Sequence, residues 1–345
     1  MSPNTAENAA PARPLPHDPL WPRTGGWQEP GPGTSPIDLA VIGIPTAFTS
    51  LSATNAHLTP AAVREALWKY SSHIVASGGP GGPGGPGGPG ALGGPGAPGI
   101  GRGAEAELVL DEALCIVDAG DVVDPDTEEG ELHAATAVRA LAARAELVVA
   151  LGGDNALTVP AALGVAGEAL PSAGLITLDA HHDLRDGRSN GSPVRRLVEA
   201  GLDPRRIVQI GIADFANSRA YRERAKEWGI TVIHRDELFE RPLHEIAAEA
   251  LAVAGAGGGP IHVDLDVDVC DRSVAPGCPA SIPGGIQAHE LRAFARMFAA
   301  DPRVRGIDIA EVDASADAPD ARTVRLAALC VLEAAAGLAQ RLGRG

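Results

Sequence analysis

The chain has 345 residues, of which 45% are hydrophobic and 21% charged, and its formal net charge is −16. This length and hydrophobic content allow a sizeable core in one large domain or two smaller ones, and they exclude a chain that is disordered throughout. The negative charge and an aromatic content of only 3% argue against nucleic acid or an anionic membrane surface as a partner.

The two ends of the chain and its cysteines indicate the cellular location of the protein. Segment 1–36 is polar, rich in proline and without the apolar stretch of a signal peptide, so we expect a disordered tail. Near the other end, the longest apolar run, 326–339, has 14 residues and contains Glu333, which makes it too short to cross a bilayer. The four cysteines form no C-x-x-C pair, which favours free thiols in a reducing compartment. These features predict a soluble, cytoplasmic protein.

Eight short apolar segments alternate with Ala-, Leu- and Arg-rich stretches that have helical periodicity. Near-continuous apolar strands between helices indicate an α/β fold, in which helices cover both faces of a mostly parallel sheet. The expected strands are 37–43, 114–118, 147–152, 174–180, 207–212, 230–234, 261–267 and 306–312.

Glycine and proline are concentrated in one tract. Residues 78–103 hold 15 of the 43 glycines and 6 of the 29 prolines. Because it has few apolar side chains to bury, this tract is expected to be a flexible loop. Too few of the expected strands precede it to build a separate core, so we predict a single domain, 37–345, that this loop interrupts.

Side chains that can bind a metal follow four of the expected strands. Ligands of open parallel sheets bind beyond the carboxyl ends of the strands, so these side chains should meet at one edge. Carboxylates gathered at one edge repel one another unless cations neutralise them, and carboxylate oxygens with an imidazole suit Mn²⁺ better than Zn²⁺. There are enough carboxylates to bridge two ions that share a nucleophile. These side chains lie in four segments, 152–155 (GGDN), 179–183 (DAHHD), 264–268 (DLDVD) and 311–313 (EVD).

Three sequence blocks resemble the signature motifs of the ureohydrolases, the family of arginase, agmatinase and formimidoylglutamase. They read DAHHD at 179–183, DVDVCDRSVAPGCPASIPGG at 266–285 and DIAEVDASAD at 308–317. The resemblance runs from about residue 37 to the C-terminus and leaves out the tail and the Gly/Pro tract. It implies a three-layer α/β/α domain with an eight-stranded, mostly parallel sheet (an arginase-like fold), and a homo-oligomer.

The same resemblance implies two manganese ions per subunit and their ligands. Asp179 and Asp266 would bridge the two ions. His181 and Asp268 would bind the second ion, and Asp183 the first. Asp183 would also carry a proton to the leaving nitrogen of the substrate.

One ligand position departs from the family pattern. The family usually has histidine after G-G-D, and this chain has Asn155. An amide oxygen can still bind Mn²⁺, though more weakly than an imidazole. Either Asn155 is a weak first-metal ligand in a working site, or the chain is a metal-depleted, non-catalytic homologue. We expect the working site, because every other ligand position is filled. Asp264 and His182 fall outside the ligand set and are expected to be structural.

The loop after Asp183 indicates the substrate. It resembles the formimidoylglutamases more than the arginases and implies that Arg185, Asn190 and Arg195 bind substrate, while Glu311 faces the amidine or guanidine group. Arginines suit a substrate with two carboxylates. The same arginines would also be found at the solvent-exposed start of a helix, where they form salt bridges and bind no substrate. We therefore expect hydrolysis of N-formimidoyl-L-glutamate to L-glutamate and formamide, as in histidine degradation.

An agmatinase or guanidinobutyrase that releases urea stays an alternative. Agmatine carries an ammonium tail, which Asp186 or Asp214 could bind. A zinc deacetylase of related fold is a weaker alternative, because it would leave several of the carboxylates without a role.

Overall fold

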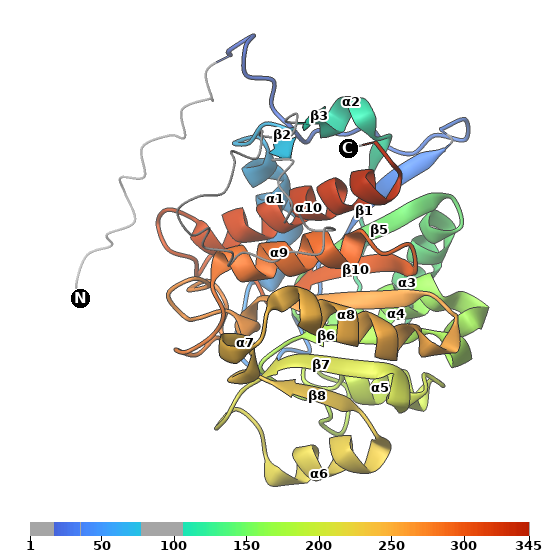
Figure 1. Ribbon diagram of the computed structural model, residues 1–345, viewed down its shortest axis with the longest axis vertical. Helices are drawn as coiled ribbons and strands as arrows, with labels where there is room; N and C mark the ends of the chain where they lie inside the picture. Colours follow the sequence, from blue (N-terminus) through green and yellow to red (C-terminus); the bar gives the residue numbers. More distant parts are fainter. Residues whose placement is uncertain (1–16, 35, 77–105, 345) are drawn as a thin grey trace, which may run out of the picture.

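The computed structural model describes residues 17–34, 36–76 and 106–344 (Figure 1). The whole Gly/Pro tract predicted as a flexible loop, 78–103, lies outside these residues.

An eight-stranded sheet forms the centre of the molecule, with the order β4-β1-β5-β10-β9-β6-β7-β8. Every neighbouring pair in it is parallel, which confirms the predicted sheet. The strands are β1 (Ile37–Ile44), β4 (Ile116–Asp121), β5 (Ala145–Gly152), β6 (Gly174–Leu178), β7 (Ile207–Ile212), β8 (Thr231–His234), β9 (Ile261–Asp266) and β10 (Val304–Ala310). A small antiparallel pair, β2 (His73–Ala76) and β3 (Ala106–Val109), was not predicted.

Helices cover both faces of the sheet and give three layers. On one face a single apolar cluster joins the sheet to α1 (Thr59–Leu67), α8 (Leu243–Ala254), α9 (Ala288–Ala299) and α10 (Arg322–Arg341). Two further clusters join the other face to α3 (Glu128–Ala142), α4 (Thr158–Ala166), α5 (Pro193–Glu199) and α6 (Arg219–Trp228). The short helices α2 (Leu110–Ala113) and α7 (Glu237–Glu240) complete the set within the described ranges. This arrangement confirms the predicted fold class.

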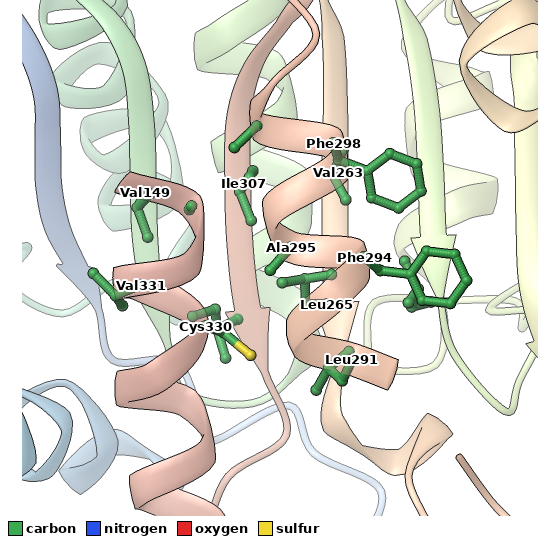
Figure 2. Close-up of a cluster of buried hydrophobic side chains, with 14 of the residues drawn as sticks. Val149, Val263, Leu265, Leu291, Phe294, Ala295, Phe298, Ile307, Cys330 and Val331 are labelled. Atoms are coloured by element: carbon green, nitrogen blue, oxygen red, sulfur yellow. The ribbon is translucent and has the colours of Figure 1, made fainter. Parts of the chain in front are cut away.

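Apolar and polar side chains alternate along β9, so that one face of the strand belongs to the core and the other is polar. Successive side chains of a strand point to opposite faces. Val263 and Leu265 therefore join the apolar cluster beneath α9 and α10 (Figure 2). His262, Asp264 and Asp266 point to the opposite face, and all three are buried. The strand thus carries a polar stripe that ends at the candidate site.

The apolar run near the C-terminus belongs to α10, a helix of 20 residues. By length and composition α10 could cross a membrane, but 78% of its most apolar window is buried inside the fold. Buried Glu333 of α10 binds two arginines of α9, Arg292 at 2.6 Å and Arg296 at 2.5 Å. Packing against α9 and the sheet therefore accounts for its apolar character.

Part of the predicted tail is structured. The Thr24 side chain is fully buried, and its backbone N–H donates to Tyr70 O at 3.0 Å. Trp27 packs against the main apolar cluster, and its Nε1 donates to Asp111 at 2.9 Å. The prediction of disorder is thus wrong for the described residues 17–34, because these few side chains anchor a segment whose average composition is polar.

Gly153 lies where two backbone segments approach closely. A Cβ added there would lie 1.8 Å from Thr46 O. We expect Gly153→Ala to lower the free energy of unfolding by about 1–3 kcal/mol or more, as overpacking does, and to displace the following residues of the site. Urea denaturation measures this effect. Gly33→Ala, whose Cβ would meet no atom within 4 Å, should leave stability unchanged.

Candidate active site

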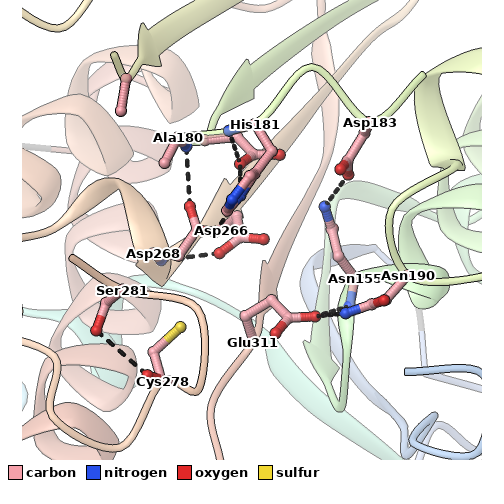
Figure 3. A network of polar contacts seen from close by, with 12 residues as sticks. Asn155, Ala180, His181, Asp183, Asn190, Asp266, Asp268, Cys278, Ser281 and Glu311 are labelled. Atoms are coloured by element: carbon pink, nitrogen blue, oxygen red, sulfur yellow. Dashed lines mark hydrogen bonds and ion pairs between the residues drawn. The ribbon is translucent and has the colours of Figure 1, made fainter. Parts of the chain in front are cut away.

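The predicted site residues follow four strands that are neighbours at the centre of the sheet. β5, β10, β9 and β6 are adjacent in that order, and all are parallel. Their carboxyl ends therefore lie at one edge, where the loops that follow them bring the polar side chains together (Figure 3).

Asp179, His181 and Asp268 form the tightest group. His181 Nδ1 lies 2.7 Å from Asp268 Oδ2 and 3.4 Å from Asp179 Oδ1. The potential ligand atoms of the three residues all lie within 4.8 Å of one another. The second carboxylate oxygen of Asp179, Oδ2, is buried and has no hydrogen-bond partner in the described part of the chain. Such an oxygen is a free ligand for a cation.

Backbone donors fix the carboxylates that follow β9. Asp266 Oδ1 accepts the N–H of Asp268 at 2.8 Å, and Asp268 Oδ1 accepts the N–H of Ala180 at 2.8 Å. The D-x-D spacing thus lets the first aspartate cap the turn that carries the second. Both side chains line the cavity described below.

The other side of the site is built on Asn155, Asp183, Asn190 and Glu311 (Figure 3). Asn155 Nδ2 donates to Asp183 Oδ2 at 2.6 Å. Glu311 Oε1 accepts from the Asn155 backbone N–H at 2.9 Å and from Asn190 Nδ2 at 2.7 Å. Asp183 and Glu311 both have positive φ angles, 53° and 62°. Backbone of this kind is unfavourable for residues other than glycine and concentrates at functional sites.

The carboxylates of the site carry more negative charge than their surroundings neutralise. Burial, followed by the charge of Asp268, raises the pKa of Asp179 to about 7. Burial and neighbouring carboxylates also raise the pKa of Glu311 to about 7 and those of Asp183 and Asp266 well above their ordinary range. The shared cause is a buried excess of negative charge, which a bound cation would relieve.

Among the carboxylates, His181 is the counter-charge. Burial alone would lower its pKa, but Asp268 and Asp179 raise it to about 12. The same contact lowers the pKa of Asp268, against the effect of its burial. The imidazole of His181 is thus held between two carboxylates, and these three side chains form a group that could hold a metal ion.

A cavity of about 430 Å³ opens onto the site. Asn155 and Asp179 are buried and do not line it. It is lined by Leu51, Ser52, His181, Asp183, Leu184, Arg185, Asn190, Gly191, Ala216, Asn217, Ser218, Tyr221, Asp266, Asp268, Ala280 and Glu311.

Of the predicted arginines, Arg185 lines this cavity and Arg195 does not. The Arg195 guanidinium donates to the backbone oxygens of Arg185 and Gly187 and pairs with Glu199. The donors of Arg195 thus hold the loop in this structure, and substrate binding by Arg195 stays a prediction. Arg188 and Arg196 of the same loop region both bind Glu131 of α3, at 3.1 and 2.5 Å.

The two residues expected to be structural lie away from the cavity. His182 Nδ1 lies 2.7 Å from Gln209 Oε1. Asp264 pairs in register with Asp308 of β10, behind the site.

Sequence reasoning missed a buried polar chain behind Asn155. Thr158 Oγ1 donates to Asn155 Oδ1 at 2.8 Å and lies 3.3 Å from Asp308 Oδ1. His262 Nε2 lies 2.6 Å from Asp308 Oδ2. The alternation of residues along 261–266 could have indicated this chain, because it places His262 on the same polar face as Asp266, four residues later.

Comparisons with known proteins cover the whole candidate site. A model of the arginase family matches residues 82–337. A formimidoylglutamase of Bacillus subtilis is 31% identical over 306 residues, 87% of this chain and 86% of that protein. The crystal structure of formimidoylglutamase from that organism superimposes with a TM-score of 0.78 at 28% identity and covers 94% of both chains.

Two further similarities cover less of the chain or have a lower sequence identity. A guanidinopropionase of Pseudomonas aeruginosa is 35% identical over 182 residues, 51% of this chain and 54% of that protein. A crystal structure of Trypanosoma cruzi formiminoglutamase with Mn²⁺ has a TM-score of 0.70 at 21% identity, over 89% of this chain and 94% of that chain.

Proposed function

This chain belongs to the arginase family and is a hydrolase of carbon–nitrogen bonds in linear amidines, and we propose that its substrate is N-formimidoyl-L-glutamate. The products would be L-glutamate and formamide. The observation that carries the proposal is the guanidinium of Arg185, which has no partner among the described residues and lines the same cavity as a cluster of carboxylates.

The donor set fits manganese. Buried carboxylates with raised pKa values and the unpartnered Asp179 Oδ2 call for a cation, and oxygen ligands with one imidazole suit Mn²⁺. The ligands would be Asp179, His181, Asp183, Asp266 and Asp268, joined by the amide oxygen of Asn155. The ions would act as Lewis acids that make water a nucleophile at neutral pH.

The chain's own residues orient the substrate and move the proton. Glu311, fixed by Asn155 and Asn190, would accept hydrogen bonds from the amidinium N–H groups and hold the trigonal carbon toward the carboxylates. Asp183 would take a proton from the attacking water and give it to the glutamate nitrogen as the carbon–nitrogen bond breaks. The buried setting strengthens both interactions, because little water screens the charges.

Arg185 selects an acidic tail. It lines the cavity, and within the described part of the chain its guanidinium has no hydrogen-bond or ion-pair partner. Asp186, a candidate partner for the ammonium of agmatine, is instead bound by Arg224 at 3.0 Å. This contact disfavours agmatine and favours a substrate with a carboxylate.

A guanidino acid is the second candidate. The similarity to a guanidinopropionase favours it, as does the presence of one arginine, Arg185, among the described residues that line the cavity, which suits one carboxylate. Such a substrate would release urea instead of formamide.

Product detection by NMR tests the proposal. The Mn²⁺-loaded protein is incubated with formimidoylglutamate, 3-guanidinopropionate or agmatine, each with and without a chelator. Chelator-sensitive formation of formamide and glutamate is expected. Urea from the guanidino acid without formamide would replace the first candidate by the second, and no product from any substrate would contradict hydrolysis by this chain.

Arg185→Ala should raise KM for formimidoylglutamate about 10- to 100-fold, the loss expected for a charged hydrogen bond, with little change in kcat. Steady-state kinetics measures the split. Arg188→Ala is the matched control, since Arg188 binds Glu131 outside the cavity and its loss should leave KM unchanged. Equal effects of the two variants would contradict the role of Arg185.

A further inference from the structure

The side-chain amide of Asn155 is held on both sides by buried partners. Its Oδ1 accepts from the Thr158 hydroxyl at 2.8 Å, and its Nδ2 donates to Asp183 Oδ2 at 2.6 Å (Figure 3 shows the second contact). An amide NH₂ is a donor, whereas the amide oxygen is a ligand that suits Mn²⁺. In this orientation the atom of Asn155 that faces Asp183 is therefore the one that cannot bind a metal.

Thr158 lies between two acceptors. Its Oγ1 is 2.8 Å from Asn155 Oδ1 and 3.3 Å from Asp308 Oδ1. A hydroxyl donates one proton and accepts through two lone pairs, so Thr158 can donate to only one of these oxygens at a time. The three residues are at most 2% exposed, so bulk water cannot replace a missing partner.

Asp308 is a fixed acceptor on the far side of Thr158. His262 Nδ1 is buried without a partner, so the ring proton belongs on Nε2, which lies 2.6 Å from Asp308 Oδ2. Asp308 Oδ1, 3.3 Å from Thr158 Oγ1, can receive the Thr158 proton, and the Asp264 carboxyl is a further neighbour of Asp308. A hydroxyl forms a stronger hydrogen bond with a carboxylate than with an amide oxygen. Thr158 therefore loses no hydrogen-bond energy when it donates to Asp308 instead of Asn155.

We propose that Thr158 is a positioning residue that lets Asn155 turn its amide oxygen toward the first metal. When Thr158 donates to Asp308, its oxygen becomes an acceptor. Asn155 then rotates by half a turn about the bond to its amide group, so that Nδ2 donates to Thr158 and Oδ1 faces Asp183. This rotation is easy, because torsions next to a planar group have broad, two-fold profiles. A cation beside Asp183 favours the turned amide, since it attracts the oxygen and repels the NH₂.

The effect of Thr158 should be confined to one metal. Without the hydroxyl, the turned NH₂ of Asn155 would be buried without an acceptor, which should weaken the first metal about 5- to 150-fold. In the described residues no hydrogen bond joins Thr158 to Asp179, His181 or Asp268. The second metal should keep its affinity.

Isothermal titration of metal-free protein with Mn²⁺ tests the inference, which rests on the proposed metal site. Thr158→Val keeps the shape of the side chain and removes the hydroxyl. One of two binding events should weaken about 5- to 150-fold and the other stay unchanged. Thr158→Ser should restore both. In an Asn155→Ala background, Thr158→Val should cause no further loss, because no amide remains to be oriented.

Three results would overturn the role of Thr158: unchanged Mn²⁺ affinities in Thr158→Val, equal weakening of both binding events, or failure of Thr158→Ser to restore binding. Circular dichroism checks the fold of each variant, and Thr158→Ala provides the same readout where the valine variant does not fold. Wild-type protein that binds no Mn²⁺ would instead overturn the metal site itself, and this inference with it.

Discussion

Replacing Asp266 by asparagine is expected to abolish both Mn²⁺ binding and hydrolysis. Asp266 is 2% exposed, ends β9 and lines the cavity next to Asp268. Asparagine keeps the oxygen that accepts the Asp268 N–H, so the turn should form, but the negative charge is lost. Loss of a group that only supports a metal ligand already costs about 10- to 100-fold in affinity or activity, so loss of a carboxylate that would itself bind the metal should exceed this range. Mn²⁺ titration and NMR product detection measure the two effects.

Asp264→Asn is the matched control for this prediction. Asp264 lies two residues earlier on the same face of the same strand and is equally buried, but it does not line the cavity. Its replacement should leave both Mn²⁺ stoichiometry and the chemical step in place. Full activity of Asp266→Asn, or equal losses in the two variants, would show that the charge of Asp266 has no special role.

The sheet and most of the candidate site could be predicted because both follow from short-range patterns. Continuous apolar strands between helices imply a parallel sheet, and the carboxyl ends of such strands meet at one edge. Neither step needs a side-chain contact. Asp179 and Asp266 could therefore be placed together from strands that are far apart in the sequence.

The roles of the arginines could not be predicted, since they depend on partners from distant segments. Arg185 and Arg195 look equivalent in the sequence, yet among the described residues Arg195 has partners for its guanidinium and Arg185 has none. Arg188 and Arg196 bind Glu131, which α3 presents from more than 50 residues earlier. The packing of α3 beside this loop decides which of these cations faces the cavity.

The orientation of Asn155 was likewise hidden from the sequence. The G-G-D-N motif shows which side chain occupies the position, but its two amide atoms are distinguished only by Thr158 and Asp183. Those contacts join the segments that follow β5 and β6 to the start of α4. An asparagine can thus occupy a ligand position while its NH₂ group, which cannot bind a metal, takes the place of its oxygen.

Glu311→Gln is expected to lower kcat/KM about 10²- to 10³-fold, the loss seen when an electrostatic contact to the reacting group is removed, without loss of Mn²⁺. Both donors to Glu311, the Asn155 N–H and Asn190 Nδ2, bond to Oε1. No described residue donates to Oε2, and the side chain lines the cavity, so Oε2 is the atom left for the substrate N–H groups. Glutamine would keep Oε1 in place and set an NH₂ where Oε2 had been. Two donors would then face each other, and the amidine would lose its acceptor.

The same substitution elsewhere in the chain separates this effect from general damage. Glu333→Gln replaces a buried carboxylate outside the site. Its partners, Arg292 and Arg296, lie on α9 and do not line the cavity. It should lower the melting temperature, because it leaves the ion pairs between α9 and α10 incomplete, while kcat/KM stays unchanged. Glu311→Gln should show the reverse, with catalysis lost and Mn²⁺ affinity kept. A loss of Mn²⁺ in Glu311→Gln would instead make Glu311 part of the metal site, and the amidine would then need another acceptor.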